Sequence, residues 1–131
     1  MSANGSRLLV WLTGTLGTSV AYLSWLGWDQ QRDQQPDGSS TGPYQPWQAI
    51  GLALTIAAIT CVCSWRRASF LGCALITVTL TLCFSSDAAT DANADGLWTL
   101  GAMALFVCTG YGTGVVATCY EAAAKAYNSR R

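Results

Sequence analysis

Four long stretches of the sequence contain no charged residue. They cover residues 8–28, 47–65, 68–86 and 97–120, and all four are rich in apolar side chains. At about 1.5 Å of rise per residue, helices of this length reach about 28–36 Å, enough to cross a hydrocarbon core about 30 Å thick. A charge near the bilayer centre costs at least about 2.5 kcal/mol, so uncharged runs of this length point to lipid. The pattern predicts an all-α, four-helix transmembrane bundle with up-down-up-down topology in one domain, 1–131.

Other folds explain these segments less well. Four strands cannot close a barrel, and an open sheet would leave backbone groups unpaired in lipid. A soluble all-α bundle is one alternative, but its helices should each have a polar face, which none of the four segments shows. A removable signal peptide is another, because Ser19-Val20-Ala21 resembles a cleavage site that would leave Tyr22 first. The apolar run continues through Trp25 and Trp28, which favours a complete first span.

The connectors between the segments predict the orientation. Six of the seven basic residues fall on one side of the predicted membrane: Arg7, Arg66, Arg67, Lys125, Arg130 and Arg131. Six of the seven acidic residues fall on the other side, in the loops 29–46 and 87–96. Because Lys and Arg near span ends stay cytoplasmic, we expect both termini in the cytoplasm and both loops outside the cell membrane. The two-residue link Arg66-Arg67 makes the second and third spans antiparallel neighbours.

Composition excludes several function classes. Only 11% of the residues are charged, against roughly 25% in a typical soluble domain, and the formal net charge is zero. No field therefore attracts nucleic acid, and we expect the lipid bilayer to be the main partner. The chain contains no His, which removes the usual general base and a frequent metal ligand. No catalytic residues and no cofactor are predicted, and an enzyme is the less favoured hypothesis.

Two motifs with metal-binding residues have simpler interpretations. The six cysteines, all within the predicted spans and without a C-x-x-C pair, are expected to act as small apolar residues rather than as a redox or metal cluster. The loop Asp91–Gly96 matches the first half of an EF-hand, so Asp91, Asn93 and Asp95 are a weak candidate Ca²⁺ site. Ala102 stands where the bidentate Glu is required, which favours a solvated acidic loop without metal. Its Asp95 would cap the fourth span.

Small residues recur at helical spacing within the spans. Gly14, Gly17 and Thr18 share one face of the first span, and Gly110 and Gly114 form a G-x-x-x-G in the fourth. Close packing within the bundle is the expected role of these faces. A docking face for another subunit or a second copy is the alternative.

Residues 42–48, GPYQPWQ, stand directly before the apolar run of the second span. With this GPY-x-x-WQ motif, the Trp28-Asp29 pair and the segment Asp95–Trp98, the chain resembles a group of small, uncharacterised actinobacterial four-span integral membrane proteins. That resemblance implies a four-span fold and supplies no activity. Aromatic and acidic residues also gather at the outer ends of the spans. We expect any binding patch among them: Trp28, Asp29, Tyr44, Trp47, Asp95 and Trp98.

Three functions remain open. A structural or accessory subunit, or an assembly factor, is favoured by the uncharged spans, the small-residue faces and the shortage of catalytic groups. Its partner would be another membrane protein or a second copy of the chain. A small transporter or channel is the alternative, suggested by the many Thr, Ser and Gly residues in the spans. A membrane-embedded redox or lipid enzyme is the third, suggested by the cysteines and the outer Asp, Tyr and Trp residues.

Overall fold

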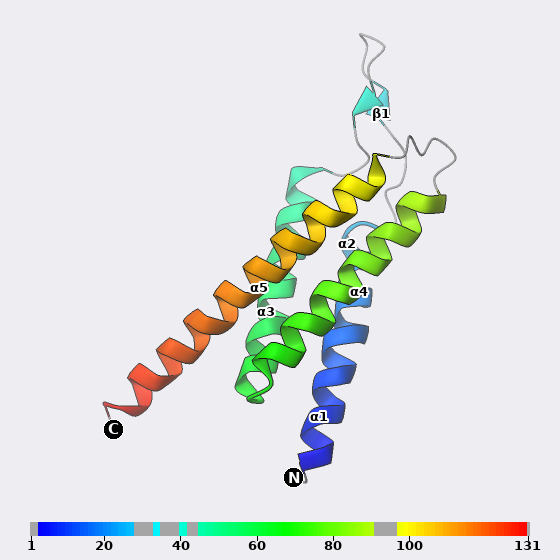
Figure 1. The fold of residues 1–131 in the computed structure, drawn as a ribbon. Helices are drawn as coiled ribbons and strands as arrows, with labels where there is room; N and C mark the ends of the chain where they lie inside the picture. Colours follow the sequence, from blue (N-terminus) through cyan, green and yellow to red (C-terminus); the bar gives the residue numbers. More distant parts are fainter. Residues whose placement is uncertain (1–2, 28–32, 35–39, 42–44, 91–96, 131) are drawn as a thin grey trace.

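The computed structural model describes residues 3–27, 33–34, 40–41, 45–90 and 97–130. Within these ranges four helical segments are long and apolar enough to cross a membrane: Arg7–Trp25, Pro46–Trp65, Ser69–Thr90 and Trp98–Asn128. We call each of them a rod, because the first is built of several consecutive helices and the others are single helices. They run up, down, up and down, and the two ends of the chain lie at the same end of the bundle (Figure 1). The predicted all-α four-helix bundle is therefore confirmed.

The first rod consists of three consecutive helical pieces. These are α1 (Ala3–Leu12), a five-residue π-helix η1 (Thr13–Gly17) and α2 (Thr18–Trp25). The helix ends at Trp25, earlier than the predicted span, since Leu26 and Gly27 both donate to the carbonyl of Tyr22. Two short strands, β1 (Asp33–Gln34) and β2 (Ser40–Thr41), pair antiparallel in the connector that follows.

Helix α3 (Pro46–Trp65) begins at the motif singled out in the sequence. Pro46 occupies the first helical turn, where a missing N–H costs nothing. Gln45 and Gln48 form a reciprocal capping box, in which the Gln45 N–H donates to Gln48 Oε1 at 2.7 Å. The Q-P-W-Q part of the motif therefore has a local structural role, because it fixes where the second span starts.

Helix α4 (Ser69–Thr90) extends beyond the predicted end of the third span at residue 86. The expected loop begins with Asp87, but the helix continues through it for another turn. The hydroxyl of Tyr22 donates to Asp87 Oδ2 at 2.9 Å, which gives this carboxylate a partner at the end of the bundle. Thr90 further satisfies the last turn by donating to the carbonyls of Ser86 and Asp87.

Helix α5 (Trp98–Asn128) is the longest element, and α4 is the centre of the bundle. Helix α4 packs against α1, η1, α2, α3 and α5, whereas α5 packs chiefly on α3 and α4. Buried residues from α2, α3 and α4 and from Leu26, just after α2, form the core: Ala21, Tyr22, Leu26, Leu52, Ile56, Ile76 and Leu80. Towards its C-terminus α5 diverges from the other helices (Figure 1).

Large apolar side chains cover the outside of the rods. Phe70 is 88% exposed, and Leu54 and Val107 are each 67% exposed. In water such a surface would be unfavourable at about 25 cal/mol per Å² of apolar area, whereas hydrocarbon surroundings remove that penalty. The arrangement is that of a multi-pass membrane protein.

The closest approach of α3 and α4 depends on one glycine. A Cβ atom added at Gly72 would lie 2.4 Å from Cys63 Cβ, so a side chain there must push the two helices apart. We predict that Gly72→Ala lowers the free energy of unfolding by about 1–3 kcal/mol, as overpacked cores do. Denaturant titration in detergent micelles measures the change.

Gly112→Ala is the matched control for this prediction. An added Cβ at Gly112 meets nothing within 4 Å. Replacing a helical glycine there should therefore leave stability unchanged or raise it by up to about 1 kcal/mol. Equal stability of the two variants would show that the Cys63–Gly72 contact does not set the helix spacing.

Candidate functional site

The predicted outer patch is only partly within the described residues. Trp28, Asp29, Tyr44 and Asp95 lie outside them, as does the weak Ca²⁺ candidate made of Asp91, Asn93 and Asp95. Trp98 begins α5, and Trp47 lies in the first turn of α3. The Trp47 ring packs edge-on against Trp25 at a centroid distance of 6.1 Å. In the part of the chain that the structure describes, no ring contact joins Trp47 to Trp98.

Trp25 packs against Gly51 and Thr55 of α3, a contact that the sequence did not predict. Its indole Nε1 donates to Thr55 Oγ1 at 3.1 Å, and Thr55 Oγ1 donates to the Gly51 carbonyl at 2.8 Å. A Cβ atom at Gly51 would lie 2.5 Å from the Trp25 ring, so only glycine leaves room for it. Gly51 and Thr55, four residues apart on α3, were the available signal, because that spacing places them on one helix face.

The predicted helix-packing residues lie in different surroundings. Gly14 faces Leu75 of α4, Gly17 faces Ile59 of α3, and Thr18 is fully buried. Gly110 faces Thr77 of α4, whereas an added Cβ at Gly114 would meet nothing within 4 Å. The structure thus brings Gly14, Gly17 and Gly110 into contacts between helices and leaves Gly114 in an open groove.

The cysteines are scattered over three helices. All six carry free thiols: Cys61, Cys63, Cys73, Cys83, Cys108 and Cys119. Cys63 is buried where α3 approaches Gly72, and Cys108 and Cys119 are exposed on α5. Among the described residues no three His, Cys, Asp or Glu side chains gather as a metal site would require.

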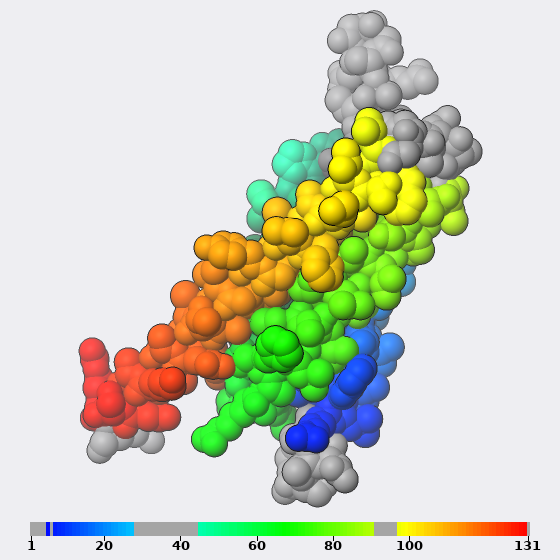
Figure 2. Space-filling model, in the orientation of Figure 1, coloured from blue at the N-terminus to red at the C-terminus, as the bar shows by residue number. Residues whose placement is uncertain are grey.

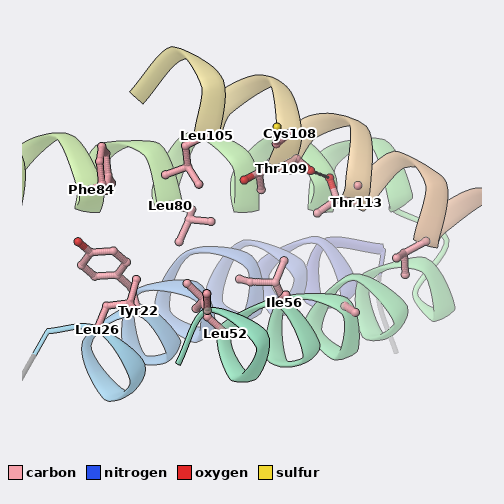
Figure 3. Close-up of a pocket in the computed structure, with 15 residues that line it drawn as sticks. Tyr22, Leu26, Leu52, Ile56, Leu80, Phe84, Leu105, Cys108, Thr109 and Thr113 are labelled. Atoms are coloured by element: carbon pink, nitrogen blue, oxygen red, sulfur yellow. Dashed lines mark hydrogen bonds between the residues drawn. The ribbon is translucent and has the colours of Figure 1, made fainter. Parts of the chain in front are cut away.

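An apolar cavity opens between α3 and α5. Its volume is about 510 Å³, and α2 and α4 supply its floor (Figure 3). One wall carries the small residues Ala49, Ala53 and Ala57 of α3, which repeat every four residues. The facing wall carries Gly112 of α5, and the buried side chains of Leu52 and Ile56 also project from α3 into the space (Figure 3). We call this space the α3–α5 groove.

Two polar side chains of the α3–α5 groove, Thr113 and Tyr22, have hydrogen-bond partners within the bundle. The Thr113 hydroxyl donates to the carbonyls of Thr109 and Gly110 at 2.8 and 3.2 Å. At the other end of the groove, the Tyr22 hydroxyl donates to Asp87. Because these groups have partners within the bundle, the groove presents an apolar surface to its surroundings.

A polar cleft of about 900 Å³ lies at the end of the bundle that carries the α3–α4 turn. We call it the basic cleft because Arg7, Arg67 and Lys125 line it, against one carboxylate, Glu121. The carboxylate of Glu121 accepts a hydrogen bond from Ser69 of α4. The divergence of α5 from the α3–α4 turn opens this region (Figure 2).

A second groove, of about 440 Å³, runs from the basic cleft along α4 and α5. We call it the α4–α5 groove. It contains Gly110 and Gly114 on α5 and Cys73 and Thr77 on α4, and most of its surface is apolar. Ser69, Phe70 and Glu121 line both spaces, so the groove and the cleft adjoin each other.

The backbone at Arg67 holds this residue at the basic cleft. The backbone angle φ of Arg67 is positive, at 55°. This is a left-handed conformation that usually belongs to Gly or Asn after a helix. The Arg67 N–H donates to the Ser64 carbonyl at 2.9 Å, and the Ala68 N–H donates to the Cys63 carbonyl at 3.2 Å. These two bonds together form a Schellman motif. An arginine here places a cation at the cleft at a cost in backbone strain.

We predict that Arg67→Gly raises the free energy of unfolding by about 0.5–1 kcal/mol, because glycine adopts the left-handed conformation without steric conflict. Denaturant titration measures the gain. Arg66→Gly is the control, since Arg66 has an ordinary, negative φ and glycine relieves no strain there. If Arg67→Gly lost as much stability as Arg66→Gly, this would contradict the conclusion that the Arg67 backbone is strained.

Comparisons with protein-family models, curated proteins and solved structures found no match for this chain.

Proposed function

We propose that this protein is a non-catalytic accessory subunit of a complex in the cell membrane, and that a transmembrane helix of a partner protein lies in the α3–α5 groove. The observation that carries the proposal is the pairing of small residues on both walls of that groove. Ala49, Ala53 and Ala57 face the side that Gly112 lines on α5.

Small residues on facing walls favour a helix as the occupant. Helices in lipid associate through close backbone approach and van der Waals packing, since burying apolar surface gains little there. Packed helix axes lie about 8–10 Å apart, and alanine and glycine permit the short end of that range. Leu105 and Val116 supply apolar contacts on the α5 wall.

The internal hydrogen bonds favour an accessory role over a transporter or channel. A polar path would need hydroxyls directed into a channel. Instead, many hydroxyls donate to carbonyls of their own helix, and the buried hydroxyls of Thr18, Ser64 and Thr77 are the exceptions. The hydroxyls bonded in this way come from all four rods: Thr15, Ser19, Thr55, Thr60, Thr81 and Thr113.

In-cell photo-crosslinking tests the partner. A photoreactive residue at Ala53, which is exposed on the groove wall, should give one crosslinked product of defined mass. Gly112→Leu should abolish that product, because a leucine fills the groove. Gly114→Leu, which adds the same side chain on the other face of α5, should leave it unchanged.

Two results would contradict the proposal. The first is a product that persists in Gly112→Leu. The second is a product of twice the 13.9 kDa chain mass, which would make a second copy the occupant.

We further propose that both termini are cytoplasmic. Arg7, Arg66, Arg67 and Lys125 support this orientation, because all four belong to the end of the bundle where the chain termini lie. In a cysteine-free background, Ala89→Cys in the last turn of α4 should react with a membrane-impermeant thiol reagent in intact cells. Asn128→Cys should react only after the cells are opened, and the reverse pattern would refute the orientation.

A further inference from the structure

We propose that the basic cleft and the α4–α5 groove together bind one anionic phospholipid, with its phosphate in the cleft and an acyl chain in the groove. This site lies on a different face of α5 from the proposed partner groove, so it does not depend on the accessory role.

The charge of the cleft selects an anion. Arg7, Arg67 and Lys125 contribute three positive charges and Glu121 one negative charge, which leaves a net charge of +2. Among the described residues no carboxylate lies in salt-bridge contact with these three cations, and Glu121 is engaged by Ser69. Basic pockets between transmembrane helices bind phospholipid headgroups in this way.

Ser64 lies at the wall of the cleft, in the same turn as Arg67. It lines the cleft and is 4% exposed, and its Oγ atom has no hydrogen-bond partner in the structure. The Oγ atom is itself enclosed by the protein, so anion binding depends on the three cations and not on this hydroxyl. The Ser64 carbonyl also accepts from the Arg67 N–H, so the hydroxyl and the strained arginine belong to the same turn.

The basic cleft and the adjoining apolar groove together favour an amphipathic ligand. The cleft adjoins the α4–α5 groove at Ser69, Phe70 and Glu121, and the groove surface is mostly apolar. Trp65 and Tyr120 also line the cleft, and these residue types favour the level of the lipid headgroups. A small soluble anion would leave the groove unused, whereas a phospholipid fills both parts.

Native mass spectrometry of the detergent-solubilised protein tests the site. Phosphatidylglycerol should remain bound as a 1:1 adduct, and phosphatidylcholine with the same acyl chains should bind at least about fivefold more weakly. Glycerol 3-phosphate, which carries the phosphate without the tail, should not displace the lipid at equal concentration.

Matched variants distinguish lipid binding at the basic cleft from a general attraction of lipid to surface charge. Arg67→Gln should weaken phosphatidylglycerol binding at least about fivefold, the effect expected of one basic contact. Arg66→Gln should change it less than twofold, because the Arg66 guanidinium lies 5.2 Å from the centroid of its own Trp65 ring and does not line the cleft.

The tail position has its own pair of variants. Gly114→Leu fills the α4–α5 groove and should weaken binding, while Gly112→Leu fills the other groove and should not. Unchanged thermal unfolding of each variant confirms that it is folded.

Equal losses in Arg66→Gln and Arg67→Gln would show diffuse attraction to the bilayer surface and overturn the proposal. Equal binding of the two phospholipids, or displacement by glycerol 3-phosphate, would also overturn it.

Discussion

The fold of this protein depends on the need to satisfy backbone polar groups inside lipid without water. Helices meet the need for the backbone, and many side-chain hydroxyls are satisfied in the same way, although those of Thr18, Ser64 and Thr77 are buried without a partner. Hydroxyls such as those of Thr55, Thr60 and Thr81 donate to the carbonyl four residues earlier in their own helix. The spans can therefore be rich in Thr and Ser and still present an apolar surface, which is why their moderate hydropathy is compatible with a membrane-spanning bundle.

With the backbone and many of the hydroxyls satisfied within each helix, close packing determines how the helices are arranged. Gly14, Gly51 and Gly72 each lie under a side chain of a neighbouring rod, and they join the first three rods tightly. Helix α5 has no such tight contact at Gly112 or Gly114. One groove lies beside each of these two glycines, on two faces of α5, and the divergence of α5 opens the basic cleft. The candidate sites thus lie beside α5, where Gly112 and Gly114 make no tight contact with a neighbouring helix.

The sequence predicted the number of rods, their order and the tight turn at Arg66-Arg67, because charge placement alone determines these features. It placed the end of the third span too early, because the rule that ends a span at Asp87 ignores the bond that Tyr22 supplies from another helix. It singled out Gly114 but not the Ala49, Ala53 and Ala57 repeat, since alanine is common in any apolar helix. Neither groove was predictable, because each requires two helices to diverge at a particular depth.

The most direct test of this account is to measure whether lipid or water surrounds the exposed apolar side chains. Spin labels at Leu54, Leu82 and Val107, which are exposed on three different rods, can be probed with oxygen and with a water-soluble nickel complex in liposomes. We predict high accessibility to oxygen and low accessibility to nickel at all three positions, with the reverse at Asn128. Nickel accessibility at the three apolar positions equal to that at Asn128 would mean that water surrounds these helices, which would contradict the account.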